Sequence, residues 1–222
     1  IALKLLVDCS GSMGGDSIVS ARVALHGALV GLTEHDHVSV SRFGSTVEHV
    51  LAPSASTPQT LRRLKPAVDA IDATLGGTEM EAALKAVFAL PVSRDCAGAD
   101  VLLVTDGEIW QAQEMIAAAR ASGHRVFAIG VGSSPAEGVL RALAEATGGA
   151  CEFATPGEAL EAAAGRMLVR IRQQPWRDAR IDWGCEPLWQ TALPTSVFGG
   201  DTVIACAGMS APAAAPTVRL LA

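Results

Sequence analysis

The chain has 222 residues, a net charge of −6 at pH 7 and a hydrophobic content of 50%. This length fits one large domain, or one domain with a smaller appended piece, and the apolar content suffices for a sizeable core. An acidic balance without a basic run disfavours nucleic acid and acidic membranes as partners. No apolar run reaches transmembrane length, so we expect no membrane insertion by this part of the protein.

Strands and helices are predicted to alternate along most of the chain. In order they are a strand at Leu3–Val7, a helix at Ile18–Leu32, strands at Val38–Phe43 and Thr46–Leu51, helices at Pro58–Ala73 and Glu79–Leu90, a strand at Asp100–Thr105, a helix at Trp110–Ser122, a strand at Arg125–Val131, a helix at Pro135–Thr147, a strand at Cys151–Ala154 and a helix at Gly157–Arg172. This alternation predicts an α/β fold with a mostly parallel central sheet and helices on both faces. The hairpin around Gly44-Ser45 adds one antiparallel edge strand.

The pattern changes after Gln173. Short β-like runs follow, separated by Pro and Gly clusters, at Ala179–Trp183, Leu188–Leu193, Val203–Ala207 and Thr217–Leu221. We therefore divide the chain into an α/β domain at 1–173 and an appended β-rich segment at 174–222. A segment of this size can hardly bury a core alone, so we expect it to pack on the domain or on further chain. The start on a strand without Met indicates a piece of a longer protein.

Five oxygen-bearing side chains stand where the chain leaves a predicted strand or a Gly-Gly break. They are Asp8, Ser10, Ser12, Thr78 and Asp106. Ligands of open α/β sheets gather at the carboxyl ends of strands, so these side chains are expected to meet. Two carboxylates and three hydroxyls form a ligand set for a hard cation.

The spacing and charge of this set point to its chemistry. Asp8, Ser10 and Ser12 alternate along an extended loop, which turns their oxygens to one side. Five oxygens and water complete the octahedron that Mg²⁺ prefers, with Mn²⁺ as the alternative and Ca²⁺ as the poorer fit. Two carboxylates neutralise the ion while hydroxyls add no charge, so the ion would accept an external carboxylate. Considered alone, without the rest of the set, Thr78 would be interpreted as a helix cap and Asp106 as a turn residue.

The motif Asp8-x-Ser10-x-Ser12, with Thr78 in Gly-Gly-Thr and Asp106 in Thr-Asp-Gly, resembles the metal-ion-dependent adhesion site of von Willebrand factor A (VWA) domains. The resemblance covers about residues 1 to 172 and implies a Rossmann-like sheet with the metal at its upper face. It also implies direct coordination by the three hydroxyls, and action of the two carboxylates directly or through water. In adhesive members an acidic residue of the partner protein takes the last position on the metal.

Two further stretches are similar to one subgroup of that family. Gly-Gly-Thr-Glu-Met and Leu-Leu-Val-Thr-Asp-Gly-Glu resemble A domains that follow a VIT domain, as in inter-alpha-trypsin inhibitor heavy chains and their bacterial relatives. The tail Leu193–Asp201 resembles the segment after the A domain in that group. The resemblance implies a VIT-associated, bacterial protein.

Three residues beside the ligands are candidates for a rim that contacts the partner. Glu79 and Glu108 directly follow ligand motifs. Their carboxylates either lie at helix N-termini, where the helix dipole favours them, or shape the electric field around the metal. Trp110 either offers an aromatic contact beside the metal or lies buried under the loop.

The cysteines and histidines give weaker signals. Five cysteines without a CxxC pair predict neither a disulfide framework nor a zinc site, and they favour a reducing compartment such as the cytoplasm. Cys9 and Cys151 are expected to be small buried hydrophobes. The segment His35-Asp36-His37 is expected to be solvated. The other histidines, His26, His49 and His124, have no evident partner in the sequence and are expected to lie at the surface or in satisfied packing.

These observations favour a protein-interaction module over an enzyme. The module would use a divalent cation to capture an Asp or Glu of a protein partner. A metal-dependent hydrolase is the alternative, because metals activate water, although no base or nucleophile converges on the motif. A structural scaffold without metal function is the third possibility.

Overall fold

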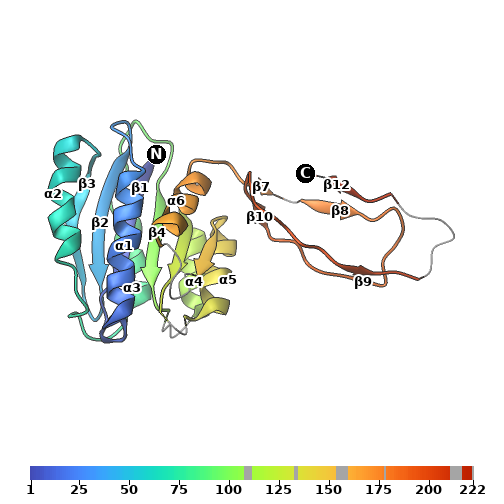
Figure 1. Ribbon diagram of the computed structural model, residues 1–222, viewed down its shortest axis with the longest axis horizontal. Coiled ribbons are helices and arrows are strands. Elements are labelled where there is room, and N and C mark those ends of the chain that lie inside the picture. The colour runs from blue at the N-terminus through green and yellow to red at the C-terminus, as the bar shows by residue number, and fades with distance from the viewer. Residues whose placement is uncertain (108–111, 133–134, 154–159, 178, 211–216, 222) are drawn as a thin grey trace. The chain divides into compact units, whose positions relative to one another are not determined.

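The computed structural model describes residues 1–107, 112–132, 135–153, 160–177, 179–210 and 217–221 (Figure 1). The chain divides into two compact units, Ile1–Arg172 and Gln173–Ala222. Within the described residues, no helix is long and apolar enough to cross a membrane.

The first unit is built around a six-stranded sheet with the strand order β3-β2-β1-β4-β5-β6 (Figure 1). Its strands are β1 (Ala2–Asp8), β2 (His37–Phe43), β3 (Val47–Ala55), β4 (Asp100–Thr105), β5 (Arg125–Gly130) and β6 (Cys151–Phe153). Neighbouring strands from β2 to β6 pair in parallel, whereas β3 pairs antiparallel with β2 at the edge. The prediction of a mostly parallel sheet with one antiparallel edge strand is therefore confirmed.

Helices connect the strands and form two groups. They are α1 (Asp16–Val30), α2 (Pro58–Asp69), α3 (Met80–Phe88), α4 (Ala112–Ala121), α5 (Glu137–Thr147) and α6 (Leu160–Ile171), with a short 3-10 turn η1 (Gly11–Met13) before α1. Helix α1 packs against α2 and α6, while α4 packs against α3 and α5. Their ends differ from the predicted ends by a few residues; α5, for example, begins at Glu137 rather than Pro135.

The two faces of the sheet are both buried, as a parallel sheet between two helix layers requires. On one face, Leu6, Leu103 and Ala128 join a core with apolar side chains of α3, α4 and α5. The alternate residues of the same strands, among them Leu5 and Leu102, are also 0% exposed. Strands β1, β4 and β5 are therefore apolar on both faces over most of their length, which places them in the interior of the sheet.

A lysine interrupts the apolar run of β1. Lys4 is 3% exposed, and its ammonium donates to three carbonyl oxygens at the end of α3. The acceptors are Val87, Phe88 and Leu90, at 3.0, 3.2 and 2.8 Å. Lys4 Nζ also lies 2.9 Å from Nε2 of His124. Since the last carbonyls of a helix have no partner within it, Lys4 satisfies groups that burial would leave unpaired.

Replacing this lysine tests its role in stability. Lys4→Met keeps an apolar chain of similar length but removes every donor. We expect the free energy of unfolding to fall by about 1–3 kcal/mol, because buried carbonyl groups lose their partners. Urea denaturation followed by circular dichroism measures the change. The control Lys65→Met, at an exposed position of α2, should stay within about 0.5 kcal/mol of the parent protein.

The described residues of the second unit form three two-stranded antiparallel sheets, β10-β7, β11-β9 and β12-β8. The strands are β7 (Trp176–Arg177), β8 (Arg180–Asp182), β9 (Trp189–Gln190), β10 (Ser196–Val197), β11 (Ala207–Gly208) and β12 (Arg219–Leu221). Strands β7 and β10 were not predicted. The predicted strand Val203–Ala207 is wrong over most of its length, because β11 begins at Ala207.

Candidate metal centre

The site forms where β1 and β4 end side by side. These strands are parallel neighbours, with Val7 opposite Val104, so the chain leaves both at the same edge of the sheet. Asp8 is the last residue of β1, and Asp106 directly follows β4. The fold therefore brings two of the predicted ligands, nearly a hundred residues apart in sequence, to one edge.

The first loop turns tightly after β1. Asp8 is 0% exposed, and its Oδ1 accepts the backbone N–H of Ser10 at 2.9 Å. This contact curls the chain into η1, and the hydroxyl oxygens of Ser10 and Ser12 then lie 3.0 Å apart. Ser10 is buried and Ser12 is exposed, so the pair runs from the interior to the surface.

The second loop, which carries Thr78, is fastened to the first by its backbone. The N–H of Gly11 donates to the carbonyl of Gly76 at 2.7 Å, and the N–H of Leu75 donates to the carbonyl of Cys9 at 2.9 Å. These bonds join the two loops independently of the ligand side chains.

The hairpin turn between β2 and β3 holds the second loop from its other side. The N–H of Ser45 donates to the carbonyl of Leu75 at 2.6 Å, and the N–H of Gly77 donates to the Ser45 hydroxyl at 2.8 Å. The N–H of Glu79 donates to the carbonyl of Gly44 at 2.9 Å. Sequence reasoning identified Gly44-Ser45 as a turn but missed this function, because the contacts span about thirty residues of chain.

A glycine is required in this hairpin turn. A Cβ atom at Gly44 would lie 2.5 Å from the Cβ of Leu75, which is closer than atoms can approach. Gly44→Ala should therefore displace the Thr78 loop and lower the free energy of unfolding by about 1–3 kcal/mol. Gly138→Ala in α5 is the matched control, because nothing lies within 4 Å of its added Cβ. Thermal unfolding should find the control as stable as the parent; equal losses in both variants would contradict the steric argument.

The third loop contains the least satisfied group of the site. Oδ1 of Asp106 is buried and has no hydrogen-bond partner among the described residues. Its charge is also felt by Asp8, whose pKa is raised first by burial and further by Asp106, against the lowering effect of hydrogen bonds from Thr105 and Ser10. The Asp8 carboxylate and one oxygen of Asp106 are thus both buried, and the negative charge of Asp106 disfavours the ionised form of Asp8.

The residues present fit a hard divalent cation. Among the described residues, one buried carboxylate oxygen lacks a donor and lies near a second carboxylate and two hydroxyls, and a divalent ion would satisfy it. No group of three or more His, Cys, Asp or Glu side chains arranged for metal binding occurs in the described part of the chain. The candidate ligand set contains two such side chains, Asp8 and Asp106, and its other members are hydroxyls.

Thr78 does not have the ordinary role of a helix cap. Helix α3 begins at Met80 and its cap position is Glu79, so Thr78 lies one residue too early. Thr78 is half-buried and Glu79 is exposed, without a side-chain capping bond. The other two rim candidates, Glu108 and Trp110, lie outside the described residues.

Comparison with known proteins decides the family. Residues 1–153 match the von Willebrand factor type A domain. The chain belongs to the von Willebrand factor type A (VWA) domain family. Domains of this family are in general protein-interaction modules rather than enzymes.

The VWA relatives are mostly much longer proteins. A von Willebrand factor A domain-containing protein of Dictyostelium discoideum is 28% identical over 213 residues, which cover 90% of this chain and 22% of that protein. The chain spans less than a quarter of the length of the first curated relatives that it matches.

Solved VWA structures share the fold. A von Willebrand factor type A structure from Catenulispora acidiphila aligns with a TM-score of 0.70 and 20% identity, over 99% of this chain and 56% of that one. Proximal thread matrix protein 1 from the mussel byssus, with a zinc-occupied MIDAS motif, aligns with a TM-score of 0.57 and 15% identity, over 73% of this chain and 45% of that one.

The histidines of this VWA domain have structural partners that the sequence did not reveal. His26 pairs with Asp69 at 2.7 Å, and His49 lies 2.9 Å from the Ser41 hydroxyl. His124 contacts Lys4, as described above. These three histidines are therefore satisfied within the fold, which agrees with the expectation of surface or satisfied positions.

Asp36, between His35 and His37, was expected to be solvated, and the structure shows that it is buried. Asp36 is 1% exposed and accepts hydrogen bonds from Arg172 and Thr33. Burial acts to raise the pKa of Asp36, but these bonds and the N-terminal ammonium hold it well below its usual range. Asp36 therefore ties the end of α6 to the loop before β2.

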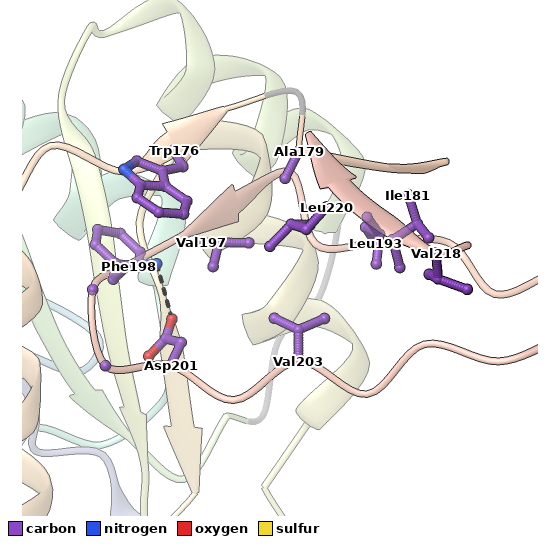
Figure 2. Close-up of a pocket in the computed structure, with 12 residues that line it drawn as sticks. Trp176, Ala179, Ile181, Leu193, Val197, Phe198, Asp201, Val203, Val218 and Leu220 are labelled. Atoms are coloured by element: carbon purple, nitrogen blue, oxygen red, sulfur yellow. Dashed lines mark hydrogen bonds between the residues drawn. The ribbon is translucent and has the colours of Figure 1, made fainter. Parts of the chain in front are cut away.

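The second unit contains an apolar groove of about 470 Å³. Figure 2 shows Trp176, Val197, Phe198 and Leu220 among its lining side chains. Asp201 is the charged residue of the lining, and its carboxylate accepts the backbone N–H of Phe198 at 3.1 Å. The groove thus offers apolar surface rather than groups for chemistry.

Proposed function

We propose that the three loops form a complete metal-ion-dependent adhesion site that captures a protein partner. Mg²⁺ or Mn²⁺ would be held by two carboxylates and three hydroxyls, with Ca²⁺ as the poorer fit. The residues that hold the ion would be Asp8, Ser10, Ser12, Thr78 and Asp106. The observation that carries the proposal is the buried Oδ1 of Asp106, which has no hydrogen-bond partner among the described residues and lies beside the buried carboxylate of Asp8.

Energetics support a cation at this place. A buried polar group without a partner costs about 1–3 kcal/mol, and more when it is charged. Asp8 has both oxygens in hydrogen bonds, whereas Asp106 has one oxygen without any among the described residues. A cation beside Asp106 would supply the missing interaction and offset the repulsion between the carboxylates.

The charge sum explains how such a site would capture a partner. When bound, the ion supplies an electrophilic centre that attracts anionic oxygen. Asp8 and Asp106 together neutralise a divalent ion, and the hydroxyls of Ser10, Ser12 and Thr78 add no negative charge. Ser12 is exposed, so the site opens to solvent there, where an Asp or Glu of another protein would approach.

The wider assignments are also proposals. The zinc-occupied MIDAS motif of the mussel thread protein supports metal binding by this fold. The sequence similarity to VIT-associated A domains supports a place in that subgroup, with a bacterial source. The five free cysteines fit a reducing compartment such as the cytoplasm.

A hydrolase is the weaker alternative. The described hydrogen-bond partners of Asp8 and Ser10 are hydroxyls and a backbone N–H, which neither accept nor supply a proton readily near neutral pH. A scaffold without metal function is the remaining alternative, and metal titration separates it from the proposal.

Removing Asp106 tests the metal site. Asp106→Ala should leave the metal-free protein at least as stable as the parent, because it removes a buried carboxylate oxygen that lacks a donor. The parent should gain about 2.7 kcal/mol of stability at a Mg²⁺ concentration of 100 times Kd, and the variant should gain nothing. Thermal unfolding in Mg²⁺ and in EDTA measures both. Asp69→Ala, at an exposed residue of α2, should keep the full gain; an equal gain in Asp106→Ala would refute the site.

Partner capture has its own test. The immobilised parent protein should retain its partner in Mg²⁺ and release it in EDTA, because the partner's carboxylate binds through the ion. Asp8→Ala should retain none while its circular dichroism spectrum stays native. Retention that ignores EDTA would rule out metal-mediated capture, even if the metal itself binds.

A further inference from the structure

One hydroxyl joins the first and third loops of the metal centre. Thr105, the last residue of β4, is 0% exposed. Its Oγ1 lies 2.6 Å from Oδ2 of Asp8 and 3.0 Å from the backbone nitrogen of Gly107. In the sequence, Thr105 is the residue before the candidate ligand Asp106, and the motif by itself predicts no function for it.

The chemistry of the groups fixes the direction of both bonds. A carboxylate can only accept, so the Thr105 hydroxyl donates its proton to Asp8. The hydroxyl oxygen in turn accepts the N–H of Gly107. The second carboxylate oxygen of Asp8 accepts the N–H of Ser10 at 2.9 Å. Asp8 is therefore held at one oxygen by its own loop and at the other by the third loop.

The same hydroxyl shapes the turn that carries Asp106. The hydrogen bond from the Gly107 N–H to the Thr105 hydroxyl forms a tight turn with Asp106 as its middle residue. Gly107 has a φ of +81°, and a Cβ there would lie 2.7 Å from the nitrogen of Ala136, so the turn has little freedom. The carbonyl of Thr105 accepts the N–H of Val131 at 2.9 Å, which anchors the start of the turn.

We propose that Thr105 is a positioning residue of the metal centre, whose hydroxyl sets the spacing of Asp8 and Asp106 before the ion binds. This inference rests on the proposed metal function. Two carboxylates without a cation repel each other. The Thr105 hydroxyl opposes their separation, because it binds the carboxylate of Asp8 and also closes the turn that carries Asp106. The ion then meets a preformed site, and less of its binding energy is lost in ordering the ligands.

Two substitutions at Thr105 separate its hydroxyl from its shape. Thr105→Val has nearly the same volume but neither donates to Asp8 nor accepts from Gly107. Thr105→Ser keeps the hydroxyl. We expect Thr105→Val to bind Mg²⁺ and Mn²⁺ about 10–100-fold more weakly than the parent, and Thr105→Ser to bind nearly as the parent does. Isothermal titration measures the affinities, and thermal unfolding in EDTA measures the stability of each metal-free protein.

A matched threonine controls for a general loss of stability. The hydroxyl of Thr147 likewise accepts a backbone N–H, from Val126 at 3.0 Å, and donates to the carbonyl of Leu143 at 3.0 Å. Val126 lies near the start of β5, at the end of the parallel strands opposite the metal loops. Thr147→Val should therefore lower stability without changing metal affinity.

The outcomes distinguish this inference from the function on which it rests. If the parent protein binds no metal, the proposed function fails. If the parent binds metal and Thr105→Val binds it equally well, the positioning role of Thr105 is refuted while the proposed function survives. Thr105→Ala, which has a smaller side chain, is titrated in parallel and decides the question by the same criterion if Thr105→Val does not fold.

Discussion

The parallel pairing of β1 with β4 is the constraint on which the site depends. Their register places Val7 opposite Val104, so Asp8 and the Thr105-Asp106 turn leave the sheet at one edge. Apolar burial on both faces of the sheet drives this pairing, and the pairing in turn sets the positions of the polar groups at the strand ends. The stability of the core thereby offsets the cost of bringing two carboxylates together in a place with little water.

Backbone contacts join the first two loops of the candidate site, whereas the link to the third loop runs through the carboxylate of Asp8. The Thr78 loop lies between the first loop and the hairpin turn, joined to each by main-chain hydrogen bonds. The buried hydroxyl of Thr105 completes the link to the third loop. At the far end of α3, Lys4 fixes the helix that follows Thr78.

Much of the first unit was predictable because its signals are local or repetitive. Apolar runs identified the strands at Leu3–Val7 and Asp100–Thr105, and alternation identified the strand at Val38–Phe43. Helical spacing of apolar residues identified the helix at Ile18–Leu32. The second unit was harder, since β7 and β10 have two residues each and show no periodicity. The contacts of Lys4, Ser45 and Thr105 were missed because each bond joins residues far apart in the chain.

The sequence by itself determined the α/β fold class, the order of its elements and the identity of the five candidate ligand residues, because apolar periodicity and motif spacing are written along the chain. The tertiary structure alone decided that Asp106 has a buried oxygen without a partner among the described residues and that Asp8 is held from two loops. It also excluded the cap role of Thr78, by starting α3 at Met80. These properties depend on burial and distance between separate loops, which strand pairing sets and local sequence does not.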